Sequence, residues 1–491
     1  MFCIDQNKLN TRKKFLGTFI FFLVGLVIFS LYKIIDVCSG ALSYSQLRIL
    51  GLMGWVLLLA FLLVFKYVTN EYITLATVFA LSMFAFSYGQ VLLFGLGAEY
   101  EYFFYNSYYS SFYNRDLRVL FDANFYTLIC LWTFCLGILV SINVQKRKER
   151  AKDARFNSSM KKTFIAVFFI SAIPYLTYNV YLALYSLAYG YSQSLELTQP
   201  AIIRYVGVFF VPASIGAVIC SEHNKKLKLF IILCAAFNCV CSFIIGGRSL
   251  AFGLMVGVIV ILLMKKKISG GTLLALCIGA FLLATISVSV ADYRSAVESA
   301  SFVSVVLKNL VQKNILVQFL GEAGFSGTSI VWTMQLVKSG YGTFGGMTYI
   351  GAIANLVPST LDVFNVLSYF EPYTQLEGLL TEHFSFNFGV GFSLVAESYI
   401  NFKWFGFVVI FFEAVIFGKL LNLKNDDGLW KRYIAVVMLT VLLSIPRRDI
   451  VFLSNQFTLC VIFLYIFITV VKWISCKPAA YVRVMREREN G

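Results

Sequence analysis

Three short stretches of the sequence place arginine where a guanidinium group can meet an anion. Arg248 stands in GGRS, Arg294 in ADYR, and Arg447 with Arg448 in IPRRD. A guanidinium forms two parallel hydrogen bonds to a phosphate, and adjacent glycines let the backbone approach the same ligand. These stretches therefore predict a site for a phosphate-bearing substrate, and Arg204 is a weaker candidate of the same kind. The alternative is structural, because an arginine at a helix end can reach lipid headgroups and an adjacent aspartate can neutralise it.

Side chains able to accept a proton from an attacking hydroxyl lie late in the chain. His383 follows Glu382, Glu322 stands in GEAGFSG, and Glu397 stands in VAESYINF. An imidazole or a carboxylate is the usual base for such a step, although a loop histidine is more often a solvated or interfacial residue. Glu413 in FFEAVIF lies inside an apolar run, where charge is costly, so it must face the protein interior. It is either a hydrogen-bonding strut or a proton relay.

The composition decides the class of protein to which these residues belong. Of the 491 residues, 59% are hydrophobic and only 13% are charged, whereas soluble domains carry about 25% charged residues. The sequence contains no P-loop, HExxH or GxSxG motif, so it gives no support to ATP-driven transport or common hydrolase chemistry. Its eleven cysteines lie mostly in apolar stretches and form no CxxC pair beside a histidine pair. We therefore expect an all-α membrane protein that holds no metal.

Helices of about 20 apolar residues must position the candidate residues, since that length crosses a bilayer. About twelve runs meet this criterion, near 15–35, 47–67, 72–94, 124–144, 163–187, 203–220, 228–246, 249–264, 271–290, 403–420, 433–446 and 451–473. The first follows a basic segment but lacks a small-residue cleavage site, which predicts a retained helix.

The distribution of charge predicts the orientation of these helices. With the N-terminus inside, the basic segments near 145–155, 225–228, 265–267 and 431–432 and the basic C-terminal tail all fall on the inner face. This is the bias of the positive-inside rule, and it favours an even number of spans with both termini in the cytoplasm. The net charge of +16 is therefore a topology signal and indicates no nucleic-acid partner.

One outer loop is far longer than a usual connection. The sequence divides into helices one to nine at 1–290, a large periplasmic loop at 291–402, and helices ten to twelve with a basic cytoplasmic tail at 403–491. Within the loop, apolar residues recur at helical spacing over 302–319, which predicts an amphipathic helix on the membrane surface. The glycine-rich stretch that follows predicts turns or a re-entrant hairpin. Long ordered loops of this kind usually carry function.

Several stretches in the second half of the chain resemble a known family. They are GGRSLAFG, ADYR, GEAGFSGTSIVWTMQLV, GGMTYIGAIANLVPS and GVGFSLVAESYINFKWFGFVVIFFEAVIFGKL. Over roughly residues 245 to 455 they resemble the O-antigen (oligosaccharide repeat-unit) polymerases of the bacterial envelope, the Wzy type. The family pattern is a glycine-rich stretch, here 389–393, followed by an aromatic–Asn–Phe element, here 399–402.

The resemblance implies a GT-C-like helical scaffold and a metal-independent glycosyltransferase without a cofactor. Such a polymerase binds two undecaprenyl-diphosphate-linked oligosaccharides at the periplasmic face of the bacterial inner membrane. It moves the growing glycan from one carrier to the terminal sugar of the other and releases undecaprenyl diphosphate, in lipopolysaccharide biosynthesis. Arg248, Arg294, Arg447 and Arg448 would then bind the diphosphate and stabilise its growing charge, and the base would come from His383, Glu322 and Glu397. A separate chain-length regulator is an expected partner.

Two other functions fit part of this pattern. An O-antigen ligase-like glycosyltransferase would use the same scaffold and donor chemistry. A lipid-linked oligosaccharide flippase or other transporter would be expected to show related halves and charged residues along a path between its helices. The sequence shows no internal repeat, and Glu413 is the only charge deep within an apolar run.

Overall fold

The structure is a computed structural model that describes most of the chain between residues 6 and 475. The described ranges are 6–38, 43–71, 73–98, 116–143, 154–189, 197–222, 224–245, 248–263, 302–312, 314–357, 364–386, 391–423 and 427–475, with isolated residues at 193, 271–289 and 362. In this part of the chain 88% of the residues are helical and no strand is present, which confirms the expected all-α class.

Ten helical segments in the described ranges are long and apolar enough to cross a membrane. They are α1 (Gln6–Cys38), α2 (Tyr44–Thr69), α3 (Leu75–Gly95), α6 (Leu117–Ser141), α7 (Ala154–Tyr189), α9 with α10 (Ala201–Tyr205, Phe210–Cys220), α11 (Lys225–Ile245), α20 with α21 (Leu394–Phe402, Gly406–Leu421), α22 (Leu429–Leu442) and the segment that begins with α23 (Ile450–Phe457). Each coincides with an apolar run of the sequence.

The remaining two of the twelve expected spans are not among these ten. Helix α12 (Arg248–Leu263) covers the eighth run, but its apolar part, Phe252–Leu263, is shorter than a full span. Half of the ninth run, 271–290, lies outside the described residues. The structure therefore gives ten candidate spans and one short apolar helix.

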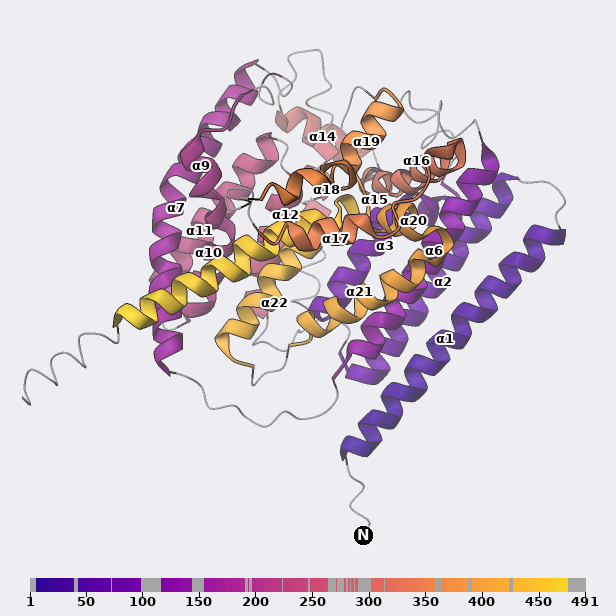
Figure 1. The fold of residues 1–491 in the computed structure, drawn as a ribbon, viewed down its shortest axis with the longest axis horizontal. Coiled ribbons are helices and arrows are strands. Elements are labelled where there is room, and N and C mark those ends of the chain that lie inside the picture. Colours follow the sequence, from indigo (N-terminus) through magenta and orange to yellow (C-terminus); the bar gives the residue numbers. More distant parts are fainter. Residues whose placement is uncertain are drawn as a thin grey trace, which may run out of the picture.

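The helices form two packed groups, which are separated in Figure 1. Helices α1, α2, α3, α6 and α21 share one buried core, and α7, α10, α11 and α12 share a second. Helix α22 serves both, because Leu439 and Leu442 face the first core while Tyr433 and Val437 face the second. The site at the end of α22 is therefore anchored to both groups.

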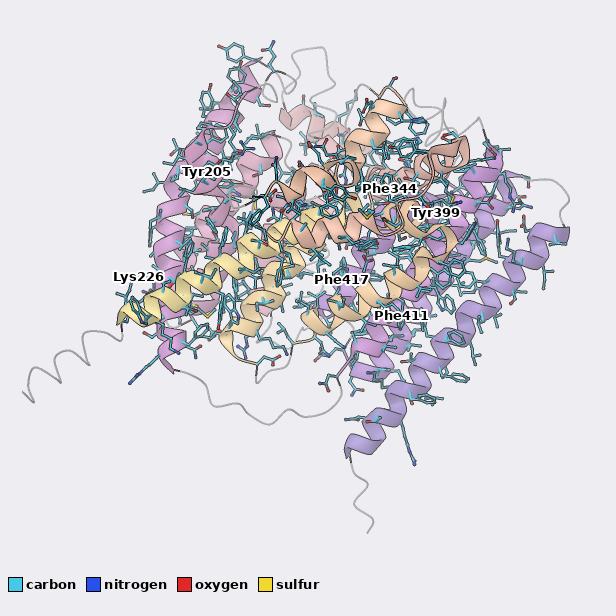
Figure 2. The ribbon with its side chains drawn as sticks, in the orientation of Figure 1. Tyr205, Lys226, Phe344, Tyr399, Phe411 and Phe417 are labelled. Carbon is cyan, nitrogen blue, oxygen red and sulfur yellow. The ribbon has the colours of Figure 1, made fainter. Side chains whose placement is uncertain are left out.

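Small residues set the close approach of α6 and α21. A Cβ atom on Gly137 would lie 2.5 Å from the Phe411 carbonyl oxygen and 2.7 Å from Ala414 Cβ. One Cβ on Gly418 would collide with the Ser141 side chain. Such small-residue contacts are how helices pack tightly in a membrane. They fix α21, which carries Phe411 and Phe417 in Figure 2, against the first helix group.

Six short helices of the predicted loop lie towards one end of the bundle, where α14, α16 and α19 stand at the top of Figure 1. They are α14 (Phe302–Gln312), α15 (Ile315–Gly324), α16 (Thr328–Leu336), α17 (Met347–Ala354), α18 (Val366–Thr374) and α19 (Leu376–His383). We call them the capping helices.

Two predictions about this region need correction. The helix expected over 302–319 is two helices, because Asn314 ends the run and its side chain caps α15 by accepting from the Val317 amide (3.3 Å). On the first of them Asn309 is buried, whereas Leu310 and Val311 are exposed. In addition, the tenth span begins at Leu394 and not at 403. Lys403 has a positive φ of 49°, which interrupts the helix there. The span therefore consists of two helical pieces, and the sequence pattern assigned the first piece to the loop.

Candidate functional site

A short turn between α22 and α23 exposes two adjacent arginines. Ile445 and Pro446 are buried and anchor the turn, whereas Arg447 and Arg448 are exposed. Asp449 then starts α23 by accepting a hydrogen bond from the Phe452 amide (2.9 Å). We call residues 444–449 the arginine turn. Its buried apolar half and capped helix hold two cations at the surface of the bundle.

Arg448 lies beside one acidic and one aromatic side chain. Its guanidinium lies 3.7 Å from the Glu377 carboxylate on α19, with side chains 51% and 41% exposed. The same guanidinium lies 5.5 Å from the centre of the Phe452 ring. An ion pair this exposed contributes about 0–1 kcal/mol, so an incoming anion can replace Glu377 at little cost.

Glu397 lies directly beneath the arginine turn and is completely buried. Its Oε2 accepts a hydrogen bond from the backbone amide of Ile450 (2.8 Å), the first residue of α23. The positive end of the helix dipole stabilises a carboxylate in this position. Glu397 therefore ties α20 to the start of α23, and it has no access to a bound substrate in this structure.

Burial also affects the third acidic group of the site. It raises the pKa of Asp449, while the Phe452 amide and Arg448 oppose that rise. A carboxyl with a raised pKa destabilises the folded state above its ordinary pKa, and this penalty disappears as the pH falls. The cap and the adjacent arginine therefore offset part of the cost of ionising Asp449.

The two motifs that carry the family resemblance, the glycine-rich stretch and the aromatic–Asn–Phe element, lie next to the arginine turn and α17. Gly391 has a φ of 65°, and a Cβ atom there would lie 3.4 Å from the Arg447 carbonyl oxygen. Asn401 donates from Nδ2 to Thr348 Oγ1 (2.9 Å) and accepts from the Gly346 amide (3.0 Å). The glycine-rich stretch and the aromatic–Asn–Phe element thus bind the arginine turn and α17 to α20. This structural use explains both motifs.

His383 ends α19, the helix that carries the acidic partner of Arg448. It is exposed, and its ring packs edge-on against Tyr341 at 6.3 Å. Six residues separate it from Glu377, which is about 9 Å along a helix axis. Of the three proposed bases, His383 is the one that is exposed and lies on the helix whose Glu377 pairs with Arg448.

Glu322 lies elsewhere on the capping helices and is partly buried. Its helix, α15, is fixed to α3 because Gln90 Nε2 donates to the Gly321 carbonyl (3.1 Å) and Gly89 packs against the Leu320 carbonyl.

The other predicted arginines contribute less to the described site. Helix α12 begins at Arg248, as expected, but its side chain lies outside the described part of the structure, as does Arg294 entirely. Arg204 is exposed on α9. Its neighbour Tyr205 stands in Figure 2 on the opposite side of the bundle from Phe344 and Tyr399.

One further feature concerns metal binding. Among the described residues, no group of three or more His, Cys, Asp or Glu side chains is placed to bind a metal ion.

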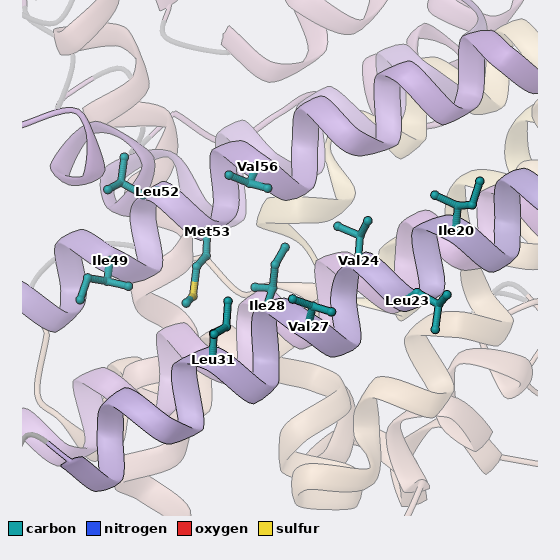
Figure 3. A pocket seen from close by; sticks show the side chains of 10 residues that line it. All are labelled: Ile20, Leu23, Val24, Val27, Ile28, Leu31, Ile49, Leu52, Met53 and Val56. Atoms are coloured by element: carbon teal, nitrogen blue, oxygen red, sulfur yellow. The ribbon is translucent and has the colours of Figure 1, made fainter.

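An apolar groove of about 540 Å³ lies between α1 and α2, lined by residues such as Leu23, Val27 and Met53 (Figure 3). It has no polar lining residue to recognise a headgroup and suits lipid chains of the bilayer.

Ten candidate spans, a layer of capping helices and polar groups gathered beside them define a multi-pass membrane protein with its site at one end of the bundle. The chain belongs to the O-antigen polysaccharide polymerase Wzy family, whose model matches residues 17–477, nearly the whole sequence. No curated protein and no solved structure matches it. The family implies a bacterial O-antigen polymerase of the glycosyltransferase type, which acts on lipid-linked oligosaccharides in polysaccharide biosynthesis.

Proposed function

We propose that this protein joins oligosaccharide repeat units carried on undecaprenyl diphosphate, at the periplasmic face of the inner membrane. A hydroxyl of the acceptor glycan attacks the anomeric carbon of the donor glycan. The new glycosidic bond forms as the bond from that carbon to the diphosphate oxygen breaks. Undecaprenyl diphosphate leaves with the bonding electron pair, and the hydroxyl proton passes to a base. The reaction consumes no nucleotide and uses no metal.

The exposed arginine turn is the observation that carries this proposal. Negative charge grows on the diphosphate as it leaves, and positioned guanidinium groups stabilise that charge more in the transition state than in the ground state. Arg447 and Arg448 are held at the surface by buried neighbours, and Arg448 has only a weak, exchangeable ion pair. Arg248 and Arg294 are further proposed ligands of the diphosphate.

The proposed base is His383, because it is exposed and lies on the helix that reaches Arg448. Glu322 stays a second candidate. Glu397 as the base would require the site to open, since its carboxylate is buried and bonded to Ile450. The fixed position of Glu397 supports a role in holding the arginine turn.

Ligase and flippase activities are the alternatives that an experiment must separate. The test is a lipopolysaccharide gel from a Gram-negative host in which the gene is deleted and then restored as wild type or Arg448→Ala, at matched protein abundance. We expect deletion to reduce the ladder to core with a single repeat unit, and only the wild type to restore it. Bare core after deletion would exclude the polymerase, and glycan accumulating on its carrier outside the membrane would indicate a ligase.

A further inference from the structure

Beneath the arginine turn, three buried side chains carry oxygen atoms that make no hydrogen bond of good geometry. These atoms are both carboxyl oxygens of Glu413, the hydroxyl of Tyr349, and Oε1 of Glu397. The three residues come from three elements: α21 of the bundle, the capping helix α17, and α20. A buried polar atom without a hydrogen bond costs about 1–3 kcal/mol. Three such groups together indicate an interaction among themselves.

These groups are neighbours. Tyr349 interacts electrostatically with both glutamates, and its hydroxyl lies close enough to Glu413 for hydrogen bonding. Glu413 also faces Glu397 and, on α6, Cys130. None of the described Lys, Arg or His side chains is an electrostatic neighbour of Glu413. The cluster therefore contains two acids and a phenol with no cation to balance them.

The two glutamates have unequal support for a negative charge. Glu397 has the Ile450 amide, the end of a helix dipole, and the Thr348 hydroxyl as a further interacting group. Glu397 also faces the carboxylate of Asp449, which opposes a charge there. Among the described residues, Glu413 has no backbone amide and no helix end beside it, and its interacting neighbours include the Tyr349 hydroxyl and the acid Glu397. An unpaired ionised carboxylate in such surroundings is far costlier than a neutral one. A proton therefore belongs on Glu413.

With a proton on Glu413, one arrangement gives each of the three groups a partner. The Glu413 carboxyl donates to the Tyr349 oxygen, and the Tyr349 hydroxyl donates to Glu397 Oε1. Glu397 Oε2 already accepts from the Ile450 amide. The result is a continuous series of donors and acceptors from the middle of α21 to the first residue of α23.

We propose that Glu413 is a protonated positioning residue that acts through Tyr349 and Glu397 to hold the arginine turn. It ties the turn to α21, and α17 joins the series only when the capping helices are in place. Glu413 touches neither substrate nor leaving group. Its effect on polymerisation rests on the proposed function, whereas its protonation does not.

The first test is independent of activity. Infrared difference spectra of the purified full-length protein at neutral pH, recorded in H2O and D2O, detect a protonated carboxyl by its carbonyl band. We expect such a band in the wild type and its loss in Glu413→Gln, with the same band kept in Glu322→Gln. A wild-type protein without this band, or a band that survives in Glu413→Gln, would overturn the proposal.

The second test uses the gel assay with conservative and disruptive variants. Gln keeps a donor for Tyr349, so Glu413→Gln should polymerise within about twofold of the wild type, whereas Glu413→Leu and Tyr349→Phe should each lose about tenfold or more. The double variant should be no worse than Glu413→Leu, because both changes break the same series. The control is Asn179→Leu, which removes a buried 2.7 Å hydrogen bond to Asn238 in the other helix group and should leave polymerisation per molecule unchanged.

The outcomes separate this proposal from the proposed function. If Glu413→Gln fails as badly as Glu413→Leu at equal abundance, the carboxyl acts as a charge or proton carrier and the positioning role is wrong. If Glu413→Leu polymerises normally, the series does not hold the turn. If the wild type itself does not polymerise repeat units, the proposed function fails, and the infrared result still decides the protonation of Glu413.

Discussion

Arg448 lies between an acidic and an aromatic partner, and the difference between them decides how it can bind. The Phe452 ring restricts the guanidinium plane, while Glu377 is a partly exposed counter-ion at 3.7 Å that an anionic substrate can displace. At the scale of single residues, the contribution of each partner can therefore be measured separately.

We predict that Arg448→Ala lowers polymerisation about 10- to 100-fold, the effect of losing a charge-assisted hydrogen bond in the transition state. Arg448→Lys should recover part of this loss, because an ammonium keeps the charge without the two-pronged geometry. Glu377→Gln should change the rate little. The measurement is ladder formation at equal protein abundance. Equal losses in Arg448→Ala and Glu377→Gln would indicate that the ion pair itself, and not the anion, is what the site requires.

One substitution of Glu397 can distinguish a catalytic base from a residue that only holds the arginine turn. A Gln side chain can accept the Ile450 amide hydrogen bond through its carbonyl oxygen but cannot take a proton. If Glu397 holds the arginine turn, Glu397→Gln should polymerise nearly as well as the wild type, and Glu397→Ala should not. The control is abundance by immunoblot. Loss of polymer in Glu397→Gln at normal abundance would identify the carboxylate as the base.

The sequence indicated these residues to different degrees. The pair of arginines in IPRRD was predictable because positive residues are disfavoured in outer loops. The contact between Glu397 and Ile450 was not, since 53 residues separate them and hydrogen bonding across helices leaves no local pattern. Tyr349 gave no signal, because one tyrosine among 28 in an aromatic-rich chain resembles an interfacial residue. The roles predicted for Arg248, Arg294 and Glu322 stay predictions.

At the scale of the elements, the close contact between α6 and α21 depends on glycines, which carry no side chain. Gly137 lies where a Cβ atom would be 2.5 Å from a backbone oxygen of α21, which cannot move without shifting the helix. This helix carries Glu413 and follows α20 in the same candidate span, after the break at Lys403. The packing of α6 against α21 therefore affects where Glu413 and α20 lie.

We predict that Gly137→Ala destabilises the protein by about 1–3 kcal/mol, the usual cost of overpacking. The measurement is the thermal denaturation midpoint of the protein in detergent. The matched control is Gly378→Ala on α19, where a new Cβ would meet only the Gln375 side chain at 3.9 Å. Similar midpoints for both variants would contradict the close approach of the two helices.

Element boundaries were harder to predict than element type. Periodicity identified long apolar helices because their signal extends over about 20 residues. It failed at Asn314 and Lys403, where one capping side chain and one positive φ interrupt a helix without changing the surrounding pattern. Single-residue events of this kind depend on tertiary contacts, so a run of apolar residues alone does not reveal them.

At the scale of the whole molecule, the number of spans is tied to the position of the basic residues. Ten candidate spans and the predicted twelve are both even, so either number leaves both termini on the same side. They differ only in whether 249–264 and 271–290 cross as a pair. If these segments cross, Lys265 to Lys267 face the cytoplasm, as the positive-inside rule favours. If they do not, that basic cluster lies on the outer face with the capping helices.

Reporter fusions should decide between these two arrangements. Alkaline phosphatase is active only outside the inner membrane, and green fluorescent protein fluoresces only inside it. We predict fluorescence and no phosphatase activity for fusions after Lys267, and the opposite after Ser385 among the capping helices. Fusions after Thr69 and Gly97, on either side of α3, provide the inside and outside controls. Phosphatase activity after Lys267 would establish ten spans and place α12 at the outer face. Fluorescence after Ser385 would place the arginine turn in the cytoplasm, where a periplasmic polymerisation could not use it.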